Sequence, residues 1–88
     1  MRRARLLGTY KGRRIFRWPV TFGETAARDQ VCCYPKETVL VVSDDAKRAA
    51  DLVADAVRHI PCITLEVIGP KGRIAAHRCW GWDTAIWN

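Results

Sequence analysis

Two histidines and two cysteines are the residues of this chain that could ligate a metal. His59 and Cys62 form a His-x2-Cys pair, and His77 and Cys79 form a His-x-Cys pair. Imidazole and thiolate are ligands of tetrahedral zinc, and a structural zinc contributes directly to folding. The spacing matches no common zinc-finger pattern, which favours two half-buried thiols and two ordinary histidines. We therefore expect no metal and no other cofactor, and zinc stays the alternative for these four residues.

Groups that would carry out catalysis are sparse. Ser43 is the one serine, and its position before two aspartates is typical of a helix N-cap rather than a nucleophile. Neither Cys–His pair lies in a known nucleophile motif, and there is no glycine-rich phosphate loop or paired-carboxylate signature. A small basic ribonuclease that uses Arg, His and Tyr as acid–base groups is the enzymatic alternative. We expect no catalytic residues and a protein that is not an enzyme.

The main charge feature is the first seventeen residues. They hold seven basic and no acidic side chains, whereas the rest of the chain has eight basic and nine acidic residues. Such a field attracts phosphates or an acidic protein surface, and arginine binds phosphate and carboxylate groups in a bidentate manner. The alternative is a solvated strand whose charges protect a sheet edge from aggregation. The candidate binding residues are Arg3, Arg5, Lys11, Arg13 and Arg17.

Four tryptophans add a second candidate surface. Trp80, Trp82 and Trp87 lie within eight residues, and Trp18 lies far from them. A domain of this size cannot easily bury four indoles with every N–H group satisfied, and exposed tryptophan is enriched at binding hot spots. We expect two of the four in the core and at least one exposed. Trp82 and Trp87 therefore join the candidate binding residues.

Residues 4–20 predict a β-hairpin that turns at Lys11-Gly12. A three-residue loop over 11–13, which pairs Tyr10 with Arg14, separates the arginines from the aromatic residues, whereas a two-residue loop would mix them on both faces. The apolar face then holds Leu6, Tyr10, Phe16, Trp18 and Val20. The opposite face holds Arg3, Arg5, Arg13 and Arg17.

The middle of the chain changes from strand to helix periodicity at Ser43. Residues 38–43 are a β-branched run that suits a buried strand, and apolar residues then recur at helical spacing. We predict a helix over residues 44–60 with Ser43 as its N-cap and a small, alanine-rich apolar face that includes Ala56. The pattern of residues 19–37 is weaker; it indicates a turn or two of helix over Glu24–Gln30 and a short strand over Val31–Tyr34.

Residues 63–68 and 73–82 predict a second hairpin around Gly69–Gly72, where proline second and glycine fourth fit a type I turn. Pairing Ile68 with Arg73 places Cys62 opposite Cys79. The two thiols would then be close enough to bridge under oxidation, although we expect them to be reduced in the cell.

These elements predict an α+β fold, in which an antiparallel sheet of two hairpins plus a central strand packs on one main α-helix in the order β-β-β-α-β-β. The 88 residues suffice for a single domain over 1–88, and 49% hydrophobic with 27% charged residues is a globular composition. No apolar run reaches the length of a membrane span, and basic residues interrupt the N-terminal segment where a signal peptide would be apolar. We expect a cytoplasmic protein without a membrane partner.

In its short chain, hairpin–helix–hairpin order and lack of a catalytic motif, the sequence resembles the small α+β proteins of phages and mobile elements, including anti-CRISPR proteins. The resemblance is one of general build. It implies an inhibitor that docks on a host defence protein or nucleoprotein complex. Many such inhibitors are acidic mimics of nucleic acid, whereas this chain carries a net charge of +6. The implied target is therefore an acidic protein surface or bound nucleic acid.

The expected function is a non-enzymatic binding module with a protein or nucleoprotein partner. The alternative is a small basic DNA- or RNA-binding protein that uses the N-terminal arginine-rich hairpin. The basic segment fits both functions, and the C-terminal tryptophans favour a protein partner, although tryptophan also stacks on unpaired bases. No sequence feature indicates an oligomeric state.

Overall fold

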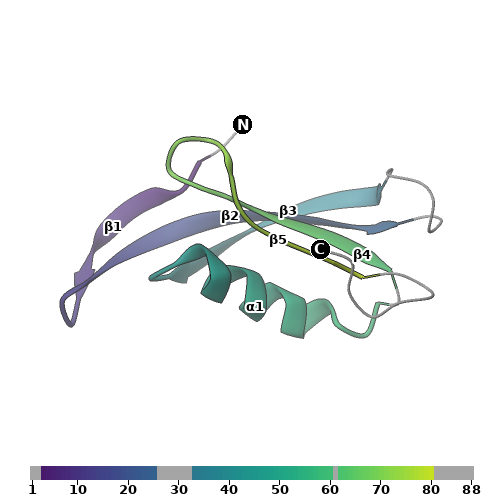
Figure 1. Cartoon of the computed structure of the whole chain (residues 1–88), viewed down its shortest axis with the longest axis horizontal. Helices are drawn as coiled ribbons and strands as arrows, with labels where there is room; N and C mark the ends of the chain where they lie inside the picture. The colour runs from purple at the N-terminus through teal and green to yellow at the C-terminus, as the bar shows by residue number, and fades with distance from the viewer. Residues whose placement is uncertain (1–2, 26–32, 61, 81–88) are drawn as a thin grey trace.

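The computed structural model describes residues 3–25, 33–60 and 62–80, and within them it confirms the predicted α+β fold and its β-β-β-α-β-β order. Five antiparallel strands form one sheet, and the helix lies against one face of it (Figure 1). The elements are β1 (Arg5–Tyr10), β2 (Arg13–Thr25), β3 (Cys33–Ser43), α1 (Ala46–Val57), β4 (Ile63–Ile68) and β5 (Ile74–Trp80).

Strand β2 is the centre of the sheet. One of its edges pairs with β3 from Phe16 to Thr25. Its other edge pairs first with β1, over residues 13–17, and then with β4, over residues 20–24. The backbone N–H of Ala4 donates to the carbonyl oxygen of Gly69 across 3.1 Å, which joins the start of β1 to the end of β4. Strand β5 adds to the outer edge of β4.

The core lies between α1 and the sheet. The helix buries Ala49, Ala50, Val53 and Val57, so the predicted small apolar face is confirmed at these positions, whereas Ala56 is exposed. The facing residues of β2 and β4 are fully or almost fully buried. Because successive side chains of a strand point to opposite faces, the residues between them lie on the other face of the sheet. No helix of the described residues covers that face, and we call it the uncovered face. The buried strand residues are Trp18, Val20, Ile63, Leu65 and Val67.

The helix begins later and ends earlier than predicted, and Ser43 is not its N-cap. Ser43 stays in β3 opposite Phe16, and its hydroxyl donates to the carbonyl oxygen of Asp45. Asp45 is the N-cap instead, because its carboxylate accepts the backbone N–H of Arg48 at 2.7 Å. The last helical residue is Val57.

The first hairpin differs from the prediction in its turn. The loop has two residues, and Tyr10 pairs with Arg13 rather than Arg14. Lys11 (φ +52°) and Gly12 (φ +79°) both have the positive φ of a type I′ turn, whose twist suits a hairpin. A β-bulge between Leu6 and Gly8 then shifts the register by one residue. The bulge keeps Leu6 on the core face and Arg5 on the face of Arg13 and Arg17, and Tyr10 lies on that face too.

The second hairpin exists as predicted, but its register was wrong by two residues along most of its length. The turn over Gly69–Gly72 is present, and the N–H of Gly69 also bonds to the carbonyl oxygen of Arg73, which leaves a three-residue loop. A bulge at Val67/Ile68 adds a further shift. As a result Cys79 lies opposite Thr64, and the predicted pairing of Cys62 with Cys79 is wrong.

The weakly patterned segment is more extended than predicted. Strand β2 runs through Glu24 to Thr25 and β3 begins at Cys33, so the helix predicted from Glu24 is wrong at its start. The rest of that predicted helix, residues 26–30, lies outside the described residues. Within the described ranges, no helix is both long enough and apolar enough to cross a bilayer.

Candidate binding face of the N-terminal hairpin

Two arginines lie directly opposite each other on the uncovered face of the sheet. Arg5 of β1 pairs with Arg17 of β2, in the part of the hairpin between the bulge and the start of β1. Like charges directly across an antiparallel pair destabilise it. Among the ion pairs of the described residues, none involves either arginine. A negatively charged group between them would relieve the repulsion, and the two guanidinium groups offer it paired donors.

Arg13 lies on the same strand but is already paired. Its guanidinium bonds to the carboxylate of Asp44, in the connection between β3 and α1. This hydrogen bond holds the pKa of Asp44 below its ordinary value, with smaller Coulombic contributions from Arg13 and Arg48. The pair ties the tip of the hairpin to the start of the helix, so Arg13 contributes to the hairpin's attachment more than to a free cationic surface.

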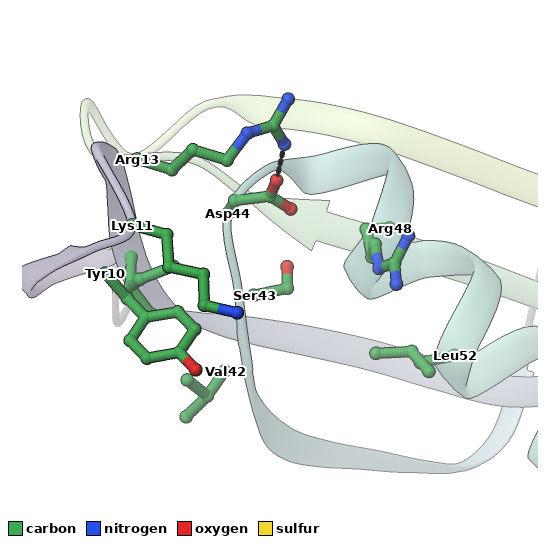
Figure 2. Close-up of a pocket in the computed structure, with 9 residues that line it drawn as sticks. Tyr10, Lys11, Arg13, Val42, Ser43, Asp44, Arg48 and Leu52 are labelled. Atoms are coloured by element: carbon green, nitrogen blue, oxygen red, sulfur yellow. Dashed lines mark hydrogen bonds and ion pairs between the residues drawn. The ribbon is translucent and has the colours of Figure 1, made fainter.

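An open pocket of about 520 Å³ lies where the tip of the hairpin, the end of β3 and the first turns of α1 meet (Figure 2). Tyr10 and Lys11 form one side of it, with the ammonium nitrogen of Lys11 5.3 Å from the centre of the Tyr10 ring. Arg48 and Leu52 reach it from α1. The pocket is therefore lined by cations and apolar groups, with Asp44 as its acidic member.

Apolar side chains lie beside the two arginines. Val42 is opposite Arg17 on the neighbouring strand and is 56% exposed. Tyr10, which is 64% exposed, lies farther along the same face at the hairpin tip, opposite Arg13. Leu40, two residues along β3, is 42% exposed. Alternation along the strands places these side chains on the same uncovered face as the arginines. We refer to this surface as the arginine face; it comprises Arg5, Tyr10, Ile15, Arg17, Leu40 and Val42.

The predicted binding residues fall into three groups. Arg5 and Arg17 share one face, as expected, and Arg3 is exposed just before β1. Lys11 lies at the turn beside the pocket, and Arg13 is held by Asp44. Trp82 and Trp87 lie outside the described residues, so their predicted exposure stays a prediction.

Of the other two tryptophans, Trp18 is in the core, as expected, and Trp80 is partly buried against it. Trp18 is 5% exposed, and its indole N–H donates to the carbonyl oxygen of Ser43 at 3.0 Å. Trp80 packs against the core, and its indole N–H donates to the carbonyl oxygen of Ile60 at 2.7 Å. Each buried indole therefore has the hydrogen-bond partner that it needs.

The four candidate metal ligands are not brought together as one site. Cys62 is fully buried, Cys79 lies opposite Thr64, and His77 lies opposite Glu66. In the described part of the chain, no three His, Cys, Asp or Glu side chains are close enough to hold a metal ion.

Sequence reasoning missed the apolar half of the arginine face and the Arg13–Asp44 pair. The predicted three-residue loop places Tyr10 on the core face, whereas a two-residue type I′ turn at Lys11-Gly12 places it correctly on the opposite face.

Comparison with protein-family models, curated proteins and solved structures finds no match for the chain. The function is therefore argued from the geometry of this face.

Proposed function

We propose that the protein is a non-enzymatic binding module that docks its arginine face on an acidic protein surface. The observation that carries the proposal is the juxtaposition of Arg5 and Arg17 with exposed apolar side chains on the same face. Acidic groups of a partner would relieve the repulsion between the arginines. Burial of Tyr10, Leu40 and Val42 would add hydrophobic stabilisation.

The apolar content favours a protein over a nucleic acid. Binding to a phosphodiester backbone is mainly electrostatic and leaves little use for exposed aliphatic side chains such as Leu40 and Val42. Arginine and aromatic residues are instead enriched at the centres of protein interfaces, where they are flanked by apolar contacts. The pairing of Arg13 with Asp44 also reduces the number of cations available for phosphates.

The resemblance in build to anti-CRISPR proteins suggests the class of partner. In that case the module is an inhibitor in the cytoplasm that covers an acidic surface of a host defence protein or nucleoprotein complex. Its own basic charge argues against mimicry of nucleic acid.

Capture of a partner from nuclease-treated host extract tests the proposal. The wild-type protein is compared with a variant carrying Arg5→Glu and Arg17→Glu. The matched control carries Lys71→Glu and Arg73→Glu, which makes the same charge change on exposed residues at the other hairpin turn. We expect wild type and control to retain a protein that the Arg5/Arg17 variant loses, with at least about a 30-fold fall in affinity if the arginines are hot spots.

Circular dichroism of the three proteins checks that each is folded. Equal capture by all three would contradict the assignment of the arginine face. Capture from untreated extract that is lost from nuclease-treated extract would show that nucleic acid links the protein to its partner. That result would favour the DNA- or RNA-binding alternative.

A further inference from the structure

The described sheet has three outer strands, and β3 has the longest stretch without a charge, which follows Pro35, Lys36 and Glu37 at its start. Strand β1 carries Arg5, and β5 carries His77 and Arg78. Strand β3 has no charged residue and no proline from Thr38 to Ser43. Natural sheets protect exposed edges with charges, prolines or bulges, because an unprotected edge pairs readily with another strand.

The same stretch of β3 exposes apolar side chains on both faces of the sheet. Val39, on the helix side, is 37% exposed, and Leu40 and Val42, on the uncovered side, are 42% and 56% exposed. Helix α1 contacts β3 as well as β2, β4 and β5, and its residue Leu52 is 50% exposed. A strand added to this edge would pair the outward-pointing backbone groups and cover apolar groups on both sides.

We propose that two copies of this chain associate through antiparallel pairing of their β3 edges, with the two-fold axis at Leu40. The arrangement is isologous, because the same segment faces itself in the two copies. It forms one continuous sheet across the dimer, with both helices on one face and both arginine faces on the other.

The polar residues at the two ends of the apolar run select this register. With the axis at Leu40, Val39 of one copy faces Val41 of the other and Thr38 faces Val42. Glu37 then stands opposite the polar Ser43 of the second copy.

Neighbouring registers are less favourable. An axis at Val41 sets Glu37 opposite Asp45, a pair of like charges, and an axis at Val39 sets Glu37 opposite the apolar Val41. Position 35 is a proline without an N–H group, so ladder pairing weakens beyond position 36. The compatible stretch is therefore 37–43, which is centred on residue 40.

Cysteine cross-linking tests the register. Directly opposed residues of an antiparallel pair have Cα atoms about 4.5–5.5 Å apart, within the range of about 4.4–6.8 Å that disulfides span. Leu40→Cys should therefore form a covalent dimer on mild oxidation. In the matched Val42→Cys variant, the two copies of residue 42 are roughly 13 Å apart along the strands, so it should not form a 42–42′ bond.

Oxidised wild-type protein controls for the native cysteines, and peptide mass mapping identifies the 40–40′ bond. Equal cross-linking of the two variants through their new cysteines would overturn the register. The absence of a 40–40′ bond in the oxidised Leu40→Cys variant would overturn it as well.

Light scattering over a range of concentrations tests the dimer itself. We expect wild-type protein to dimerise and Leu40→Lys to be monomeric, because the two lysines would face each other at the axis. Ile74→Lys is the control: Ile74 is 55% exposed on β5, so this variant should dimerise like wild type. A monomeric wild-type protein at every concentration, or a Leu40→Lys dimer as stable as the wild type, would overturn the proposal.

Discussion

Arg13 and Arg17 lie on the same strand and the same face, but only Arg13 has an acidic partner among the described residues. Asp44 accepts a hydrogen bond from Arg13, whereas Arg17 faces Arg5 on one side and Val42 on the other. The two positions are alike in the sequence, since each is an arginine in an alternating strand. Their difference arises because the end of β3 brings Asp44 to the tip of the hairpin.

Arg13→Gln should raise the pKa of Asp44 towards its ordinary value, because the hydrogen bond from Arg13 is the main cause of its depression. A carboxyl whose pKa is lower in the folded state stabilises the fold above its unfolded pKa of about 3.9. That contribution disappears as the pH falls through the lower folded value. Titration of the Asp44 carboxyl carbon by NMR measures the shift. With Lys71→Gln the pKa should not change, and an unchanged pKa in Arg13→Gln would contradict the assignment.

At the scale of elements, the sequence predicted which strands and helix form but not their exact registers. The change in periodicity at Ser43 located α1, and β-branched runs located β3 and β4. The three-residue loop is favoured by the sequence because a two-residue turn without a bulge would mix arginines and aromatic residues on both faces. The bulge at Leu6/Gly8 removes that conflict for Arg5 and Leu6 but not for Tyr10, which lies with the arginines, and one glycine in an alternating pattern did not predict it. The sequence therefore identified the arginines of the candidate site but not its apolar residues, which are Tyr10, Leu40 and Val42.

Gly8→Ala should lower the free energy of unfolding by about 1–3 kcal/mol, because Gly8 has a φ of +154° that residues with a side chain rarely adopt. No atom lies within 4 Å of where the added Cβ would be, so the cost comes from the backbone rather than from a clash. Thr9→Ala, at the next exposed position of β1, is the matched control and should cost less than about 1 kcal/mol. Urea unfolding measures both, and equal losses would show that the bulge does not depend on glycine.

At the scale of the whole molecule, the helix covers one face of the sheet and leaves the other with the positive charge of the hairpin. If β3 edges pair as proposed, the two arginine faces lie on the same side of one sheet. A partner with two acidic sites would then be bound bivalently, which raises the overall affinity without any new kind of contact.

Both a protein and a nucleic acid could satisfy Arg5 and Arg17, so binding of isolated nucleic acid distinguishes the two kinds of partner. Fluorescence anisotropy with labelled duplex and single strands, from low to physiological salt, requires no knowledge of the partner. With Arg13 held by Asp44, four candidate cations (Arg3, Arg5, Lys11 and Arg17) remain for phosphates, so contacts from these residues should give a salt slope for duplex no steeper than about −3.6.

We predict that dissociation constants at physiological salt stay within the non-specific range of roughly 10⁻⁴–10⁻⁶ M. Submicromolar binding that is lost with Arg5→Glu and Arg17→Glu but kept with Lys71→Glu and Arg73→Glu would contradict the account and identify a nucleic-acid-binding protein.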